Sequence, residues 1–134
     1  IRHIILCGHS QCGAMKALLH QESLKDLPAA GAWFRHAEAT KRIVTQKYSD
    51  RGLSDEELGV IATEQNVLVQ LNNLSTHPCV AARLASGEVE VYGWYYDIGA
   101  GVIRQYDQEL RRFVRLDGEA RAAATLPLVG VAAK

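Results

Sequence analysis

The sequence predicts an α/β fold, in which a mainly parallel central sheet is flanked by helices and carries an antiparallel edge strand. Residues 1–7 form an aliphatic, β-branched run that leads into a glycine-bearing turn and then into good helix formers. Residues 88–96 alternate as a strand does, but only after a long helical stretch, which allows parallel pairing with the first strand. Residues 102–106 follow after a short turn and are therefore expected to run antiparallel.

Composition and charge exclude several classes of function. The chain has 134 residues, 48% hydrophobic and 22% charged, which suits one soluble globular domain. Its formal net charge of zero supplies no basic field for nucleic acid or for an anionic membrane. Its three cysteines are an odd number, which favours a reducing compartment over a disulfide framework. We therefore expect a cytoplasmic protein with neither nucleic acid nor membrane as a partner.

The first half of the chain is expected to hold one strand and two helices. Residues 1–7 are predicted to be a fully buried strand that ends at Gly8, and residues 14–20 to be a helix. After a loop with Pro28, residues 30–48 are predicted to form one helix. Its inward stripe consists of Trp33, Ala37, Thr40, Val44 and Tyr48.

The second half begins with a helix-start signal. Ser54 and Glu57 have capping-box spacing and predict a long helix that ends near Leu74. A shorter helix is expected from Pro78 to just before Gly87. The residues of the long helix expected to face inward are Leu58, Ile61, Leu68 and Leu71.

The domain organisation is predicted to be simple. Residues 1–106 are expected to belong to a single domain, and residues 107–134 to form a C-terminal tail. Residue 1 is an isoleucine that already lies within the first expected strand. We therefore expect that further sequence of the same domain precedes it.

The most informative segment is Cys7-Gly8-His9-Ser10-Gln11-Cys12-Gly13, at the carboxyl end of the first strand, where open α/β sheets place their ligand sites. His9 and Cys12 offer an imidazole and a thiolate three residues apart, and both groups suit Zn²⁺. Taken alone, the pair is also compatible with a buried thiol beside a hydrogen-bonded histidine.

Three segments carry a resemblance to a known family. Residues 4–15, IILCGHSQCGAM, closely resemble the zinc-ligand segment of β-carbonic anhydrases. Residues 64–67, EQNV, resemble the helix motif of that family, and residues 91–98, VYGWYYDI, resemble its final core strand and turn. The matches keep the order and spacing of the family from residue 1 to about residue 106. Residues 32–38, AWFRHAE, resemble the cyanobacterial, carboxysome-associated branch.

The resemblance implies that His9 and Cys12 are two of three protein ligands of a zinc ion. The third would be a cysteine in a Cys-x-Asp-x-Arg motif, which this sequence lacks, so the ligand and its Asp–Arg pair are expected upstream. No other catalytic residue is then expected in this chain. Cys7, which would share a strand face with His9, is an alternative third ligand. Cys79 is expected to be a small apolar packing residue.

The implied activity is the zinc-dependent, reversible hydration of CO₂ to bicarbonate and a proton. Metal-bound water loses a proton near neutral pH, and the hydroxide attacks CO₂. Tyr96 matches the tyrosine of a bicarbonate effector pocket in some members; its alternative role is aromatic packing on a strand face. The resemblance also implies a homodimer or a higher homo-oligomer, with carboxysome shell or scaffold proteins as further partners.

Two other functions stay open at this point. Relatives with this kind of site hydrolyse COS or CS₂, and access to the pocket would decide between these substrates and CO₂. A non-catalytic carboxysome scaffold or bicarbonate-binding homologue is the alternative outside enzymes. With two ligands of three, residues 1–134 alone are expected to be inactive.

Overall fold

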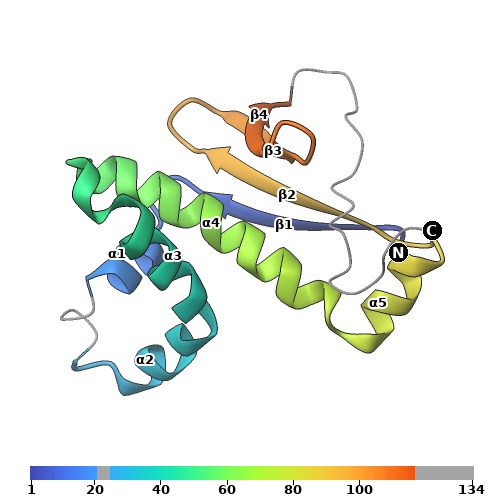
Figure 1. Ribbon diagram of the computed structural model, residues 1–134, viewed down its shortest axis with the longest axis horizontal. Helices are drawn as coiled ribbons and strands as arrows, with labels where there is room; N and C mark the ends of the chain where they lie inside the picture. The colour runs from blue at the N-terminus through green and yellow to red at the C-terminus, as the bar shows by residue number, and fades with distance from the viewer. Residues whose placement is uncertain (21–24, 117–134) are drawn as a thin grey trace.

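The computed structural model describes residues 1–20 and 25–116, which form a four-stranded sheet with helices packed against it (Figure 1). The strands are β1 (His3–His9), β2 (Glu90–Asp97), β3 (Val102–Asp107) and β4 (Arg112–Arg115), and they lie in the order β1-β2-β3-β4. β1 and β2 are parallel, whereas β2–β3 and β3–β4 are antiparallel. The α/β fold and the parallel pairing across a helical crossover are therefore confirmed.

β4 was not predicted, and it extends the sheet beyond residue 106. It pairs with β3, so the expected antiparallel edge strand lies between β2 and β4. β4 has four residues, and an arginine stands at each end of it, which leaves too little alternation to mark a strand. The rest of the predicted tail, from residue 117, lies outside the described residues.

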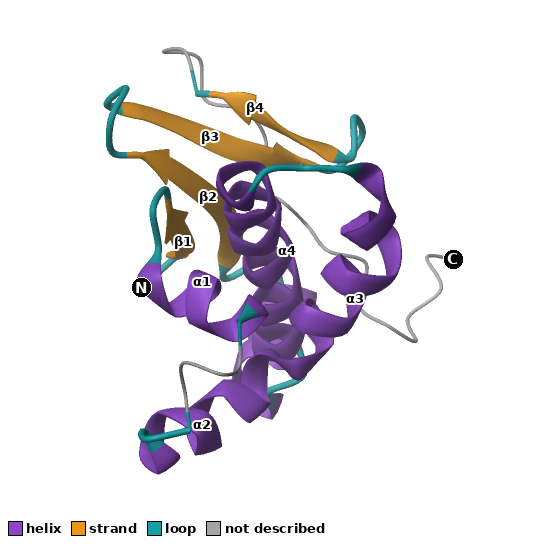
Figure 2. Ribbon diagram, turned by 90° about the vertical axis from the view of Figure 1, so that its left-hand side faces the viewer, coloured by secondary structure: helices purple, strands orange, loops and turns teal. Residues whose placement is uncertain are grey.

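The helices gather on one side of the sheet (Figure 2). None in the described ranges is long and apolar enough to cross a membrane. The α-helices are α1 (Gly13–Leu19), α2 (Pro28–Phe34), α3 (Glu38–Tyr48), α4 (Asp55–Ser75) and α5 (Pro78–Ala85), with 3₁₀ turns η2 (Arg35–Ala37) and η3 (Ser49–Arg51).

The capping box at the start of α4 is confirmed. The backbone N–H of Glu57 donates to Ser54 Oγ at 3.3 Å, and the backbone N–H of Ser54 donates to Glu57 Oε2 at 2.8 Å. Of the residues expected to face inward, Leu71 is fully buried, and the others are half-buried at the margins of two hydrophobic clusters. The residues that α4 buries are Ala62, Thr63, Val67, Leu71 and Ser75.

The prediction of one helix over residues 30–48 was wrong. The helix is interrupted by η2, where the tighter 3₁₀ turn changes the angle between successive side chains. Gln70 of α4 donates a hydrogen bond to the backbone carbonyl of His36 at 3.1 Å, which satisfies an acceptor at the break. Trp33 therefore leaves the expected stripe and is 75% exposed, whereas Phe34 packs against a core cluster.

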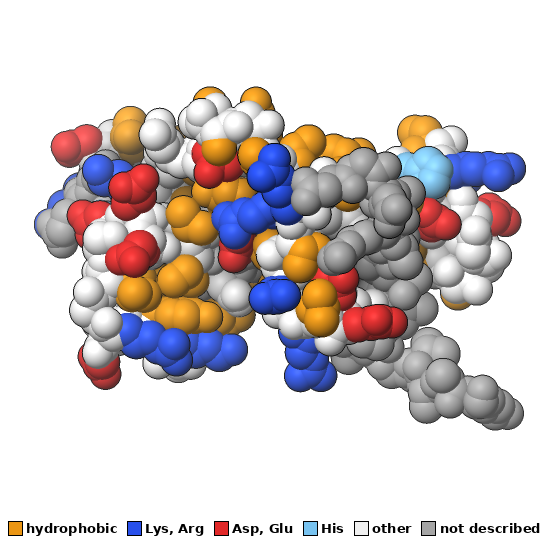
Figure 3. Space-filling view, turned by 90° about the horizontal axis from the view of Figure 1, so that it is seen from above, with side chains coloured by type: hydrophobic (Ala, Val, Ile, Leu, Met, Phe, Trp, Pro, Cys, Tyr) orange, Lys and Arg blue, Asp and Glu red, His pale blue; other side chains and the backbone are white. Residues whose placement is uncertain are grey.

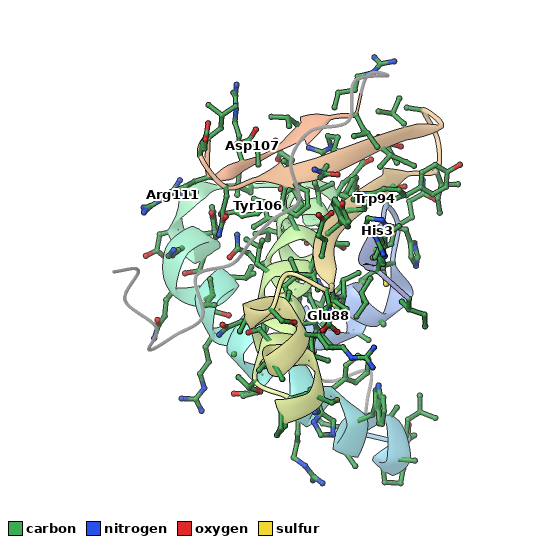
Figure 4. All side chains as sticks on the ribbon, turned by 90° about the vertical axis from the view of Figure 1, so that its right-hand side faces the viewer. His3, Glu88, Trp94, Tyr106, Asp107 and Arg111 are labelled. Atoms are coloured by element: carbon green, nitrogen blue, oxygen red, sulfur yellow. The ribbon has the colours of Figure 1, made fainter. Side chains whose placement is uncertain are left out.

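The prediction that the first strand is fully buried was also wrong. Burial alternates along β1, and Ile5 is 46% exposed. Within the described part of the chain, α4 packs against one face of β1 and β2, and the opposite face stays open. Figure 4 shows His3 and Trp94 on that open face.

The surface seen in Figure 3 interleaves acidic and basic side chains with hydrophobic ones.

Two glycines allow α4 to lie directly on the sheet. A Cβ at Gly8 would lie 2.5 Å from Thr63 Cγ2 and 3.0 Å from Val67 Cγ2. A Cβ at Gly93 of β2 would lie 2.8 Å from Leu71 Cδ1. Such contacts are closer than side-chain atoms tolerate, so glycine at these positions sets the distance between the helix and the sheet.

Candidate metal centre

The end of β1 and the start of α1 bring His9 and Cys12 to one cavity. His9 is the last residue of β1, and Cys12 immediately precedes α1. Between them Gln11 adopts a left-handed backbone with φ of 56°, which reverses the chain within two residues. Both side chains line a cavity of about 280 Å³, together with Thr63 and Asn66 of α4.

A backbone hydrogen bond fixes the orientation of the His9 ring. Nδ1 lies 2.8 Å from the carbonyl oxygen of Ser10. Because a carbonyl oxygen can only accept, Nδ1 carries the proton and donates it. In the neutral imidazole Nε2 then holds the free lone pair, which is the form that binds a metal ion.

The loop between the two candidate ligands is tied to the end of β2. The backbone N–H of Ser10 donates to the carbonyl of Tyr96 at 2.9 Å. Ser10 Oγ accepts a hydrogen bond from the backbone N–H of Ile98, also at 2.9 Å. The position of the loop is therefore set by the strand next to β1 as well as by β1 itself.

The helix side of the cavity is held by a polar contact between α3 and α4. Thr40, which is fully buried, donates to Asn66 Oδ1 at 3.0 Å, and Gln70 donates to the same oxygen at 3.3 Å. Thr40 belongs to the stripe that the sequence predicted to face inward. The contact fixes the Asn66 side chain on the wall facing the candidate ligands.

Cys7 shares the exposed face of β1 with His9 and lines the same cavity. Its Sγ donates to the carbonyl of Gly8 at 3.3 Å. Desolvation raises the pKa of the Cys7 thiol, and a hydrogen bond from the backbone of Tyr96 acts in the opposite direction. Among residues 1–20 and 25–116, no three His, Cys, Asp or Glu side chains lie close enough to hold a metal ion. Cys7 therefore does not complete a local trio with the two candidate ligands.

The other sequence candidates lie in different places. Tyr96 is the direct register partner of His9 on β2 and is 36% exposed, so it stands beside the candidate ligand on the open face of the sheet. Cys79 is exposed at the start of α5, so its expected role as an apolar packing residue was wrong.

A charged cluster behind the site was not predicted from the sequence. Arg104 Nη1 of β3 lies 2.9 Å from Glu64 Oε1 of α4, and its guanidinium lies 4.4 Å from the centroid of the Tyr95 ring. Burial raises the pKa of the Glu64 carboxyl, and the charge of Arg104 acts in the opposite direction. Glu64 belongs to the EQNV motif, which was the available signal; nothing local marks Arg104.

Cys12 also lines a second and larger cavity of about 760 Å³. Its wall includes Lys16 of α1, Asp55 of α4 and Asp97 of β2. Cys12 thus lines both cavities, whereas Ser10 and Gln11 line only the larger one.

The fold and the position of His9 and Cys12 define an α/β protein with a candidate metal site at the carboxyl end of a parallel strand. The carbonic anhydrase family profile matches residues 1–103. A carbonic anhydrase of Synechocystis sp. is 45% identical over 115 residues, which are 85% of this chain and 41% of the relative.

Solved structures of β-carbonic anhydrases also match this chain. The β-carbonic anhydrase CcaA matches with a TM-score of 0.85 at 43% identity, over 92% of this chain and 54% of that one. One of two tetrameric β-carbonic anhydrases of Sordaria macrospora matches with a TM-score of 0.65 at 26% identity, over 78% of this chain and 52% of that one.

The chain belongs to the carbonic anhydrase family, in its β class, which confirms the resemblance read from the three motifs. It spans roughly half the length of the relatives that it matches.

Proposed function

We propose that the protein containing this chain catalyses the zinc-dependent, reversible hydration of CO₂ to bicarbonate and a proton, with His9 and Cys12 as two zinc ligands. The observation that carries the proposal is the shared cavity of these two side chains at the end of β1. His9 presents Nε2 with its lone pair because Nδ1 is bonded to Ser10. An imidazole nitrogen and a cysteine sulfur are ligands that zinc prefers.

The donor set fits zinc but is incomplete within the described residues, since a catalytic site uses three protein ligands. The third ligand is expected to be the cysteine of a Cys-x-Asp-x-Arg motif outside these 134 residues, together with its Asp–Arg pair. The relatives are about twice as long as this chain, which leaves room for such a segment. Residues 1–134 alone are therefore expected to be inactive.

When bound, zinc would act as a Lewis acid that lowers the pKa of water and so provides a nucleophile for CO₂ at neutral pH. The reaction joins one water oxygen to the carbon of CO₂ and releases one proton to solvent. The residues of this chain do the positioning. The Ser10 carbonyl holds the His9 ring, and Asn66 and Thr63 shape the opposite wall of the cavity.

Tyr96 is proposed to contribute to a bicarbonate effector pocket. Its support is the match to the family tyrosine and its place beside His9 with an exposed side chain. The tryptophan and arginine that complete such a pocket would come from outside this chain. Bicarbonate bound there would lie next to the strand that carries a zinc ligand.

We further propose a homodimer or a multiple of one as the assembly, in the cytoplasm. The exposed Trp33 supports this, because aromatic residues are enriched at interface cores. A carboxysome location with shell or scaffold partners is the narrower form of the proposal; its support is the cyanobacterial origin of a similar relative.

The direct experiment is zinc analysis of the intact protein combined with stopped-flow CO₂ hydration. We expect one zinc per chain and a rate far above that of buffer. A zinc-loaded protein that hydrolyses COS or CS₂ but leaves CO₂ at the buffer rate would replace the substrate. A protein that holds no zinc and binds bicarbonate would instead be a non-catalytic homologue.

A further inference from the structure

Ser10 uses all three of its polar groups to connect the candidate metal site to the sheet. Its N–H donates to Tyr96 O at 2.9 Å, and its carbonyl accepts from His9 Nδ1 at 2.8 Å. Its hydroxyl accepts from the backbone N–H of Ile98 at 2.9 Å. One residue thus contacts a proposed zinc ligand, the proposed effector tyrosine and the turn after β2.

The hydroxyl replaces a backbone acceptor at the point where the strands part. The parallel ladder between β1 and β2 ends at the pair His9 and Tyr96, and the Ser10 N–H extends it by one bond. Beyond that point the backbone of Gln11 is left-handed and the chain leaves the strand. The regular ladder therefore offers no carbonyl of β1 as an acceptor for the backbone N–H of Ile98. Ser10 Oγ reaches across the gap and accepts the Ile98 N–H instead.

The hydrogen bonds of Ser10 couple the position of the loop to the geometry of the candidate ligands. The carbonyl that orients the His9 ring belongs to the same residue whose side chain is anchored to Ile98. A rotation of the Ser10 peptide would move that carbonyl and shift the ring. It would also move Cys12, which lies two residues further along the same turn.

We propose that Ser10 is a positioning residue of the metal site, whose hydroxyl holds the backbone between His9 and Cys12 in the ligand geometry. The inference rests on the proposed function for the identity of the metal. Groups that orient metal ligands in this way typically change metal affinity by about 10–100-fold when removed. The expected effect of losing the hydroxyl is a zinc affinity lowered by at least about tenfold.

The test uses the intact protein and the variants Ser10→Ala and Ser10→Thr, with Ser86→Ala as the matched control. Ser86 Oγ bonds a carbonyl of its own helix end, Arg83 O, at 3.2 Å, away from the site. Zinc affinity is measured by competition with a chromophoric chelator. The visible spectrum of the cobalt-loaded protein reports ligand geometry independently of catalysis.

We expect weaker zinc binding and an altered cobalt spectrum in Ser10→Ala, with both restored in Ser10→Thr and unchanged in Ser86→Ala. The thermal unfolding midpoint of the metal-free Ser10→Ala protein should stay close to that of the wild type. Wild-type affinity and spectrum in Ser10→Ala would overturn the proposal, and so would a Ser10→Thr variant as weak as Ser10→Ala. A wild type that binds zinc without hydrating CO₂ would overturn the proposed function while leaving this test intact.

Discussion

Glu64 of α4 and Arg104 of β3 form an ion pair of 2.9 Å across the interface between helix and sheet. Burial raises the pKa of Glu64 above its ordinary value of 4.5 despite the nearby guanidinium. The folded protein therefore binds this proton more tightly than the unfolded chain does. The contribution of Glu64 to stability is full below pH 4.5 and decreases as pH rises through the raised pKa.

The raised pKa of Glu64 predicts how the stability of the protein changes with pH. We subtract the free energy of unfolding of Glu64→Gln from that of the wild type. This difference should fall as pH rises above about 4.5, which is the ordinary pKa of a glutamate. Denaturant unfolding of both proteins between pH 4 and pH 8 measures the fall, which is expected to be on the order of tenths of a kcal/mol or more. A difference that grows with pH would show that the ion pair outweighs burial.

Glu57, on the same helix, should behave in the opposite way. Hydrogen bonds from the backbone N–H and hydroxyl of Ser54 lower the pKa of Glu57. Its contribution is therefore present above its ordinary value of 4.5 and is lost as pH falls through the lowered pKa. The free energy of unfolding of the wild type, minus that of Glu57→Gln, should therefore rise with pH. If this difference and the one for Glu64 changed with pH in the same direction, the opposite pKa shifts assigned to the two glutamates would be refuted.

A second kind of prediction concerns the spacing between α4 and β1. Gly8→Ala places a Cβ 2.5 Å from Thr63 Cγ2 and should destabilise the fold by about 1–3 kcal/mol through overpacking. Gly13→Ala is the matched control, because a Cβ there meets no atom within 4 Å and lies at the start of a helix. It should be neutral or stabilising by up to about 1 kcal/mol. Equal losses in both variants by denaturant titration would contradict the packing explanation.

The adjacent aromatic residues Trp33 and Phe34 should separate association from stability. Trp33 is 75% exposed, whereas Phe34 packs against the core cluster that contains Val44. Trp33→Ala should weaken self-association in sedimentation of the intact protein while leaving its unfolding midpoint nearly unchanged. Phe34→Ala should lower stability by about 2 kcal/mol. Unaltered association in Trp33→Ala would place the interface elsewhere.

Local signals in the sequence predicted local structure well. Ser54 and Glu57 marked the start of α4 because a capping box involves four consecutive residues. The strand at β2 followed from its alternation, and the motif around His9 and Cys12 marked the carboxyl end of β1.

Three of the features that the sequence analysis got wrong or did not predict depend on distant residues. The break at η2 is accompanied by a bond from Gln70 to His36 O, thirty-four positions away, which no helical pattern reveals. The half-exposure of β1 depends on whether another element covers its second face, and an aliphatic run cannot show that. Glu64 and Arg104 are forty positions apart and become neighbours only when β3 folds over α4.

We propose that His9 and Cys12 bind zinc and that Cys7 does not. The zinc content of four purified variants of the intact protein tests this proposal: His9→Ala, Cys12→Ser, Cys7→Ser and Cys79→Ser. His9→Ala removes the imidazole, and Cys12→Ser replaces the thiolate with a much less acidic hydroxyl. Both variants should lose most zinc binding and essentially all CO₂ hydration. Cys7 and Cys79 are both exposed, so their serine variants should keep the metal with little loss of stability. Full zinc in Cys12→Ser, or zinc loss in Cys7→Ser equal to that in His9→Ala, would contradict the assignment.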